Sequence, residues 1–437
     1  MAQQFNPSTP TALQVGNVVV DQASTAVEQG SVLNTALVLA YALIGAWFIP
    51  RTLGSKYGRQ LRVLLGLLAL YLIWALFSIL WSVDQALTIR RFGQLALLVV
   101  GSYGLGAGFY GQSEQGRLLL ASHVLVAGLT AMATLWLALL STGSVDLLNP
   151  AFAAKGIGLG TVVAHPVAFS MFAAVCLWRQ RVLSGLLCLT YIAFALLALF
   201  AQKVRFISLY SAGLLAILLL ARVNLKRAVP WLLAAGFFAS IALAVIVVAD
   251  TGAVGGTLYR FVTLDSSGQD LSDLSGRVEL WAELQHYVDA RPVLGYGFGA
   301  FWNPDNLHQV QEVISWAPVV AHNGYIDELL ATGLIGGVLS VLFWLAAVVV
   351  ALASARDRRD DFAALVLCWT LLFLLLNWGD SIMQLYFRFP FYVALSGLFA
   401  LAARETLSSS AKRPAKAGGR VSFQRSARSA TNSSTAV

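Results

Sequence analysis

Three residues of this sequence have the type and the setting for chemistry on an anionic substrate: Arg205, Arg277 and His322. Arg205 ends a four-residue turn, 202–205, between two long apolar runs that leave its side chain little room to wander. A guanidinium held in this way suits a phosphate group, because its planar fork bonds two oxygens at once. The competing interpretation is a plain cation that anchors the turn at a membrane surface.

Arg277 stands at the first turn of a predicted amphipathic helix, whose apolar face carries Val278, Trp281, Leu284 and Val288. The helix dipole disfavours a cation there, but the free backbone N–H groups of a first turn also point outward. Arginine and N–H groups together would make an anion site. The alternative is an ordinary solvated arginine.

His322 precedes Asn323, which is a predicted N-cap because Asp327 and Glu328 follow in the early turns, where acids are favoured. The histidine is therefore expected at the lip of the next helix, open to its aqueous edge. An imidazole there titrates near neutral pH, which suits a general base or a cation that contacts phosphate.

The remaining histidines and the cysteines are weaker candidates. His286 falls on the predicted amphipathic helix, His308 in a polar stretch, and His123 and His165 within apolar runs, where His165 before Pro166 can line an inner cavity. All three cysteines also fall in apolar runs, as buried thiols. No zinc-like spacing and no Asp-x-Asp pair occurs, so neither a metal nor another cofactor is expected.

Glycine alternates with aromatic residues from Pro292 to Phe301, a pattern that looks superficially like a dinucleotide fingerprint. It lacks the preceding strand and the surrounding βαβ unit that such a site requires. We expect instead a turn whose backbone approaches a ligand or another helix closely.

The elements that position these residues must be membrane helices. The chain has 437 residues, 58% of them hydrophobic and 11% charged, so the bilayer must act as its solvent. Alternating ten-residue strands are absent, which predicts an all-α, polytopic bundle of 11–12 spans. No cleavable signal peptide is evident in the first 30 residues. The eleven predicted spans cover 33–49, 61–80, 92–110, 117–140, 161–178, 181–201, 205–221, 228–249, 328–353, 362–378 and 384–402.

Lysine and arginine set the predicted orientation, because cytoplasmic loops carry an excess of them. The loops near residues 51–62, 179–181, 222–227 and 356–359 are basic, as is the tail. The segment 250–322 holds three arginines, no lysine and nine acids, a net charge of −6, and is assigned to the periplasm. Cations are disfavoured on the periplasmic side, so each one there is a candidate for binding an anionic ligand or for anchoring at the membrane surface. They are Arg90, Arg91, Lys155, Lys203, Arg205, Arg260, Arg277, Arg291 and Arg388.

The predicted organisation follows from these spans. A polar N-terminal segment, 1–30, precedes about eight helices in 31–249, a periplasmic loop with amphipathic helices in 250–323, and about three helices in 324–403. A disordered basic cytoplasmic tail covers 404–437. Eleven spans would place the N-terminus outside, unless the first 30 residues conceal a twelfth, so its side stays open.

Several of these features together resemble a known superfamily: the O-antigen ligases, with the Wzy-type O-antigen polymerases and the O-linking protein oligosaccharyltransferases. The resemblance covers most of the chain. It is carried by Leu80-Trp81-Ser82-Val83-Asp84 with Arg90 and Arg91, the turn with Arg205, Gly276-Arg277 with Leu280-Trp281, the run from Pro292 to Gly299, and His322-Asn323 with Gly333.

The resemblance implies an inverting, metal-independent glycosyltransferase in lipopolysaccharide biosynthesis, multi-pass in the bacterial inner membrane, with its active site facing the periplasm. It would move O-antigen polysaccharide from undecaprenyl pyrophosphate to lipid A–core oligosaccharide. Arg205 and Arg277 would hold the pyrophosphate, and His322 would take or orient the acceptor proton. Further substrate contacts would come from Arg90, Arg91, Lys203, Arg260, Asn323 and Arg388.

The other partners expected are membrane lipids, and no nucleic acid is expected. Two alternatives within the superfamily are a polymerase, with a second lipid-linked glycan as acceptor, and an O-linking oligosaccharyltransferase. A different class is a transporter or lipid flippase, but such proteins place ionisable residues near the midplane of the membrane. Here they gather at the outward ends of the predicted spans.

Overall fold

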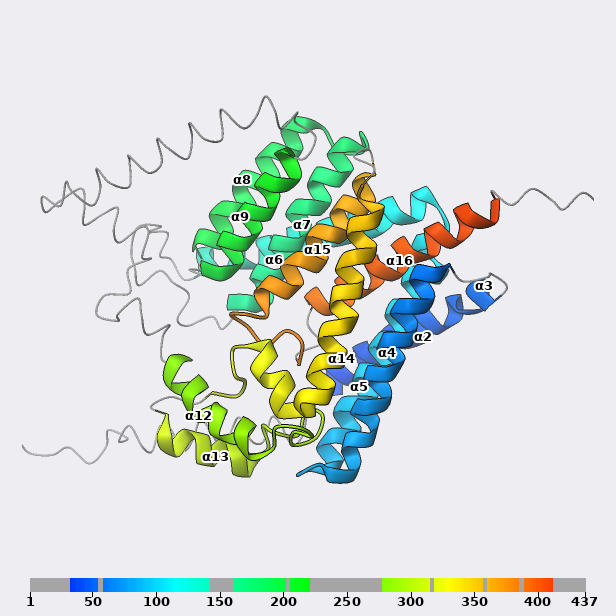
Figure 1. Cartoon of the computed structure of the whole chain (residues 1–437). Coiled ribbons are helices and arrows are strands. Elements are labelled where there is room, and N and C mark those ends of the chain that lie inside the picture. Colours follow the sequence, from blue (N-terminus) through cyan, green and yellow to red (C-terminus); the bar gives the residue numbers. More distant parts are fainter. Residues whose placement is uncertain are drawn as a thin grey trace, which may run out of the picture.

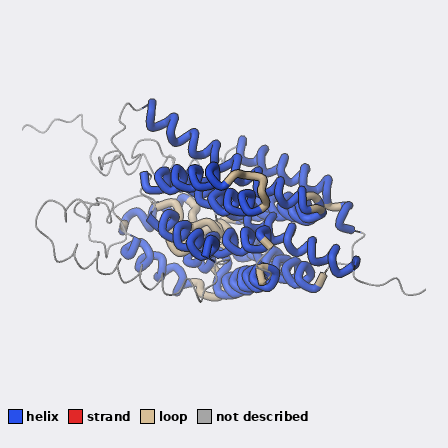
Figure 2. Tube along the Cα trace, turned by 90° about the horizontal axis from the view of Figure 1, so that it is seen from above, coloured by secondary structure: helices blue, strands red, loops and turns tan. Residues whose placement is uncertain are grey.

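The computed structural model describes residues 32–53, 58–141, 160–201, 205–220, 277–314, 318–356, 360–384 and 389–411. Within these ranges the regular structure is helical and contains no strand (Figures 1 and 2), which confirms the predicted all-α class. The helices are α2 (Val32–Phe48), α3 (Pro50–Leu53), α4 (Arg59–Phe77), η1 (Ser78–Trp81), α5 (Gln85–Gly108), η2 (Tyr110–Gln112), α6 (Glu114–Ser141), α7 (Gly160–Arg179), α8 (Gly185–Ala201), α9 (Arg205–Leu220), α12 (Arg277–Ala290), α13 (Pro304–Val313), α14 (Gly324–Ser354), α15 (Asp361–Leu376) and α16 (Phe389–Ala411).

Five of these helices are long and apolar enough to cross a membrane: Asn34–Thr52, Arg59–Trp81, Gln85–Gln112, Glu114–Leu137 and Gly324–Ser354. Five shorter apolar helices accompany them: Val163–Arg179, Gly185–Leu199, Phe206–Leu220, Asp361–Leu376 and Phe389–Arg404. These ten helices coincide with ten of the eleven predicted spans, and the chain is a polytopic helical bundle. The eleventh predicted span, 228–249, lies outside the described residues.

Small residues let the helices of the bundle approach closely. A Cβ atom on Gly45 of α2 would lie 2.5 Å from the Cα of Gly101 on α5. Tight glycine contacts of this kind drive helix association in lipid, where apolar side chains gain little by leaving the solvent. Elsewhere the core is aromatic: the fully buried Trp369 of α15 donates its indole N–H to the carbonyl of Phe169 on α7, at 3.0 Å.

Helix α14 is kinked at Gly333, whose backbone (φ 63°, ψ −166°) is open to glycine alone. The kink frees backbone groups, and distant segments satisfy them. The Trp74 indole donates to the Thr332 carbonyl at 3.0 Å, the Tyr296 N–H donates to the Leu330 carbonyl at 2.7 Å, and the Leu334 N–H donates to the Pro292 carbonyl at 2.8 Å. Hydrogen bonds at the kink therefore connect α14 with α4 and with the glycine-aromatic turn.

The turn from Pro292 to Phe301 confirms the predicted close approach, and the neighbour is a helix. Gly295, Gly297 and Gly299 all have positive φ. A Cβ on Gly295 would lie 2.6 Å from the Gly333 nitrogen, and one on Gly297 would lie 2.5 Å from the Ser82 Cβ. The turn thus docks between the kink of α14 and the segment that joins η1 to α5.

Helices α12 and α13 lie together at the end of the bundle where α14 begins (Figure 1), around a second apolar core. The predicted apolar face of α12 is partly wrong. Leu280 and Leu284 are fully buried, whereas Val278 is 46% exposed. The buried stripe is turned toward residue 280 because α12 packs on α13 and on the first turns of α14, and neither neighbour is visible in the helix's own periodicity.

Candidate active site

The turn after α15 collects contacts from the two candidate catalytic segments. The Gly379 carbonyl accepts a hydrogen bond from Arg277 Nη1 at 2.9 Å. The Gly324 N–H is shared between two carbonyls of the same segment, that of Asn377 at 2.8 Å and that of Asp380 at 3.1 Å. Arg277 and the His322–Gly324 turn, 45 residues apart in sequence, are therefore fastened to neighbouring carbonyls of one short segment.

Arg277 is the first residue of α12, and its side chain is half-buried. Burial lowers the pKa of its guanidinium, and the nearby Asp380 carboxylate opposes that shift. Its guanidinium carbon lies 5.8 Å from the centre of the Phe206 ring, an interaction between a cation and an aromatic face. Among the described residues the Arg277 guanidinium makes one hydrogen bond, and a guanidinium has five N–H donors, so others can serve an anion.

Phe206 connects Arg277 to the other predicted arginine, because Arg205 precedes it and is the first residue of α9. The side chain of Arg277, at the N-terminus of α12, therefore reaches Phe206 in the first turn of α9, and each of these helices begins with an arginine. Helix N-termini present free N–H groups and the positive end of the dipole, so this junction suits an anionic group. The side chain of Arg205 lies outside what the structure describes.

His322 lies where α14 begins and is partly exposed. Asn323 is the N-cap, as predicted: its side-chain oxygen accepts from the N–H groups of Tyr325 and Ile326, at 3.0 and 3.3 Å. The backbone of His322 is left-handed (φ 51°), a conformation that costs a non-glycine residue roughly 1–2 kcal/mol. This strained backbone persists because both neighbours are fixed.

The neighbour before it, Ala321, is held by two side chains. Its carbonyl accepts the Trp281 indole N–H at 2.8 Å, and its N–H donates to the Asp327 carboxylate at 3.0 Å. The same carboxylate accepts the Trp302 indole N–H at 2.7 Å. Asp327 is 2% exposed, so it holds the His322 turn in place and does not face a substrate.

Glu328 joins the first turn of α14 to the turn after α15. Its carboxylate accepts from Gln384 at 2.7 Å, from Tyr71 at 3.2 Å and from Thr332 at 2.8 Å. These three donors come from three different segments of the chain. Both early acids of α14 therefore do more than complement the helix dipole: they fix where the helix starts.

A buried pair that the sequence did not single out lies beside Arg277. His165 Nε2 on α7 is 3.5 Å from the Asp380 carboxylate, and the two residues are 1% and 6% exposed. Sequence reasoning noted His165 as a possible cavity residue and passed over Asp380. The available signal was an acid in an apolar stretch at the end of a predicted span, which is a costly position without a role.

The other predicted substrate contacts divide into two groups. Arg90 and Arg91 are half-buried on α5, and a Cβ atom on Gly299 would lie 2.9 Å from the Arg91 Cγ, so Arg91 packs on the glycine-aromatic turn. Lys203, Arg260 and Arg388 lie outside the described residues.

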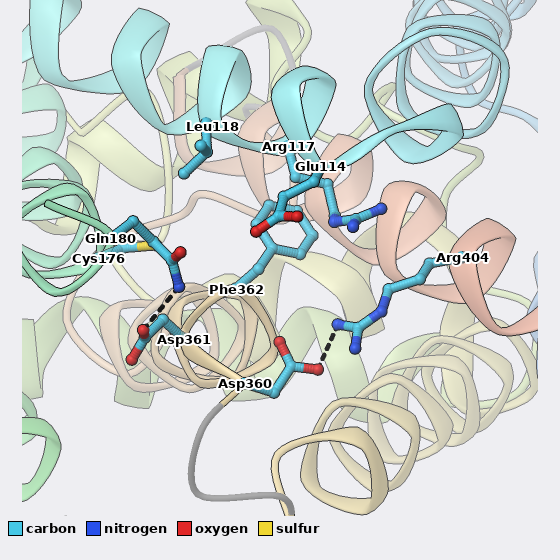
Figure 3. A pocket seen from close by; sticks show the side chains of 9 residues that line it. All are labelled: Glu114, Arg117, Leu118, Cys176, Gln180, Asp360, Asp361, Phe362 and Arg404. Carbon is cyan, nitrogen blue, oxygen red and sulfur yellow. Dashed lines mark hydrogen bonds and ion pairs between the residues drawn. The ribbon is translucent and has the colours of Figure 1, made fainter. Parts of the chain in front are cut away.

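Figure 3 shows a pocket of about 220 Å³. Its lining residues place it at the end of α7 and the start of α15, opposite to the ends that carry His165 and the Gly379 turn. The side chains that line it pair with one another: Arg404 forms an ion pair with Asp360, and Gln180 donates to Asp361 at 2.8 Å. Helix α15 starts at the pocket with Asp361 and ends at the candidate site, about 24 Å away for 16 residues. The pocket contains none of the predicted site residues. We call its two charged contacts, Arg404 with Asp360 and Gln180 with Asp361, the clasp.

In the described part of the chain, no group of three or more histidine, cysteine, aspartate or glutamate residues is placed to hold a metal ion. The polar groups named above at the His322 end are arginine, the two histidines His165 and His322, and acids held by hydrogen bonds or by an ion pair. Such a set binds and neutralises anions through hydrogen bonds and charge.

Fold and site together define a multi-pass helical membrane protein with a polar site at one end of its bundle. Residues 190–341 match the family model for O-antigen ligase, which confirms the predicted resemblance to this family over that part of the chain. The match runs from α8 into α14 and includes Arg205, Arg277 and His322. It supports a membrane enzyme of the ligase or polymerase type, with a lipid-linked glycan donor and a lipid acceptor in general. The curated proteins searched contain no match to the sequence.

Proposed function

We propose that this protein is an inverting, metal-independent glycosyltransferase that moves O-antigen polysaccharide from undecaprenyl pyrophosphate to lipid A–core oligosaccharide. The observation that carries the proposal is the shared turn: Arg277 and the His322–Gly324 segment bind the carbonyls of Gly379 and Asp380. This arrangement supports a site in which a desolvated cation and a base act together, the two groups that such a transfer requires.

In this proposal Arg277 and Arg205 bind the pyrophosphate of the donor, supported by the N-termini of α12 and α9. Charge on the leaving pyrophosphate grows as its bond to the sugar breaks, so fixed cations stabilise the transition state more than the ground state. Partial burial of Arg277 strengthens this effect, because a desolvated charge interacts more strongly with an anion. Two guanidinium groups would then do the work that a divalent cation does in other phosphate sites.

His322 acts on the acceptor. The acceptor hydroxyl oxygen forms a bond to the anomeric carbon, the bond from that carbon to the pyrophosphate oxygen breaks, and the lipid pyrophosphate leaves with the electron pair. His322 takes the hydroxyl proton or orients the hydroxyl for attack. A single displacement inverts the anomeric centre. Asp380, beside His165 and Arg277, helps to set the position and charge balance of the arginine.

We further propose that the site faces the periplasm and that the protein resides in the bacterial inner membrane. The basis is the charge distribution of the sequence: segment 250–322, which contains Arg277 and His322, is acidic, and loops such as 179–181, at the opposite ends of the helices, are basic. Arg117 and Arg404, which line the pocket, and Arg179, which pairs with Asp361, lie at those opposite ends. This agrees with a cytoplasmic clasp and a periplasmic site.

The proposal is tested by reconstitution. Purified protein in lipid vesicles is given undecaprenyl-pyrophosphate-linked glycan and lipopolysaccharide that lacks O-antigen, with a chelator present and no nucleotide. We expect a glycan–lipid A–core conjugate. If chains lengthen only on a second lipid-linked glycan, the protein is a polymerase. If the glycan lipid crosses the bilayer and no conjugate forms, the enzyme proposal is wrong.

A further inference from the structure

Four exposed apolar side chains gather where the glycine-aromatic turn meets the kink of α14. They are Leu80 on η1, Val293 and Leu294 on the turn, and Leu334 on α14, and they are 74%, 49%, 41% and 56% exposed. We call these four residues the apolar tip. Val293 and Leu294 belong to no predicted span, so lipid contact is not already implied for them by the span pattern.

The depth of the apolar tip in the membrane follows from the length of α14. After the kink at Gly333, the helix continues to Ser354, roughly 20 residues, or about 30 Å at 1.5 Å per residue. That length alone covers the hydrocarbon thickness of a bilayer, about 30 Å. Gly333 and Leu334 therefore lie at the boundary of the hydrocarbon on the His322 side.

Hydrogen bonds hold the turn at the same depth. The Pro292 carbonyl accepts from the Leu334 N–H at 2.8 Å, and the Leu294 carbonyl accepts from the Trp81 indole at 2.9 Å. The Gly295 N–H donates to the Arg291 carbonyl at 3.1 Å, and proline has no N–H to satisfy. Three backbone groups of the turn are thus bonded within the protein, which lowers the cost of holding this non-helical segment at the edge of an apolar phase.

The residues around the apolar tip are those favoured at a membrane interface. Trp74 and Trp81 lie side by side, with ring centres 5.1 Å apart, and indoles gather at the level of lipid headgroups. Arg291 is exposed immediately before the turn, with its guanidinium 4.9 Å from the centre of the Tyr296 ring. A long basic side chain there reaches the headgroups while its stem stays apolar.

We propose that the apolar tip is embedded among the phospholipid chains at the headgroup boundary of the outer leaflet. The partner is the lipid itself, and the surface is continuous with the lipid-facing side of α14. The segment that follows α12 is then held on the bilayer by lipid contact as well as by the kink. The inference depends on the spanning length of α14 and stands whether or not the proposed transfer reaction is right.

The test measures depth with a fluorophore. Leu294→Cys is labelled with bimane in a background in which Cys176, Cys188 and Cys368 are replaced by alanine, in nanodiscs of phosphatidylethanolamine and phosphatidylglycerol. The control is Val313→Cys, an exposed apolar position (63%, against 41% for Leu294) that follows Glu312 on α13, away from the kink. Nitroxide-labelled phospholipid and iodide serve as quenchers from the lipid and from water.

We expect the 294 label to emit at shorter wavelength than the 313 label, to lose fluorescence with nitroxide lipid and to resist iodide. The 313 label should show the reverse. If iodide quenches both labels equally, the apolar tip lies in water and the inference is wrong. Val293→Cys is measured in parallel, so that a local disturbance at 294 cannot decide the result, and size-exclusion chromatography verifies the fold of each variant.

Discussion

At the residue scale, Arg277 combines a structural bond with free donor capacity. One N–H of its guanidinium donates to the Gly379 carbonyl, and the guanidinium lies against the Phe206 ring. The other N–H groups of this half-buried guanidinium can bind an anion. Lysine carries the same charge on a similar stem but lacks the fork that bonds a carbonyl and an oxyanion together. The two substitutions, to lysine and to alanine, therefore separate charge from geometry.

Arg277→Ala is expected to lower the rate of glycan transfer by about 10²–10³-fold, the usual loss when one donor to a developing anion is removed. Arg277→Lys should restore part of this loss. Transfer is measured in the reconstituted assay at saturating acceptor. Gln285→Ala, at an exposed position of the same helix, is the control and should leave transfer unchanged. Equal transfer by Arg277→Ala and Gln285→Ala would remove Arg277 from the site.

At His322 glycine is a better test substitution than alanine, because the backbone there is left-handed and glycine adopts that conformation without strain. Glycine relieves strain of about 1 kcal/mol at this φ and costs a similar amount in chain entropy, so His322→Gly should keep the melting temperature within a few degrees of wild type. Transfer should fall by about 10²–10⁴-fold with loss of the general base. His322→Gly with near-normal transfer would show that the imidazole takes no proton.

At the element scale, the kink of α14 is the joint that sets the site relative to the bundle. It splits the helix into a first part that carries Asp327 and Glu328 and a second part of spanning length. The carbonyls and N–H groups it frees are bonded by α4 and by the glycine-aromatic turn. The kink is therefore rigid, and a substitution at Gly333 should lower both the free energy of unfolding and the rate of transfer.

Gly333→Ala places a Cβ against the Val293 carbonyl in a backbone region that alanine does not adopt, so the free energy of unfolding should fall by about 1–3 kcal/mol or more. Transfer should fall with it. Gly66→Ala on α4, where a Cβ meets nothing within 4 Å, should instead stabilise the protein by up to about 1 kcal/mol. Thermal unfolding in detergent compares the two. A stable Gly333→Ala variant would mean that the kink is not fixed by this contact.

At the scale of the whole molecule, the two ends of the bundle have separate tasks. The His322 end carries the desolvated arginine and the strained histidine, and the other end carries paired charges around the pocket. Helices α7 and α15 contribute to both ends. Changes at the clasp should therefore affect the stability of the bundle without changing the chemistry of the site.

Asp360 tests this separation, because it pairs with Arg404 and also caps α15 through the Ala363 N–H at 3.0 Å. Asp360→Asn keeps the cap and loses the charge, so its melting temperature should fall slightly. Asp360→Ala loses both and should cost about 1 kcal/mol more. Transfer per folded molecule should equal that of wild type in both. A transfer defect without unfolding would show that the two ends are coupled.

The sequence alone determined the features that depend on neighbouring residues: the positions of the helices and of their caps. Hydropathy placed ten described helices because each apolar run must cross the same thickness of hydrocarbon, and the cap at Asn323 and the start of α12 near Arg277 follow from short-range preferences. The resemblance to the family model likewise rested on residues that stand in order along the chain. The domain boundaries and the site roles stay predictions.

Tertiary structure alone decided which of these residues meet. The bond of Arg277 to Gly379, the contact of Phe206 with Arg277 and the pair His165–Asp380 join segments separated by up to about 200 positions, and no periodicity encodes such neighbours. The buried face of α12 likewise depends on its packing against α13 and α14, and the α14 kink depends on hydrogen bonds from α4 and the glycine-aromatic turn. Helix formation is local because its hydrogen bonds close within four residues, whereas the site exists only where packing brings separate helices together.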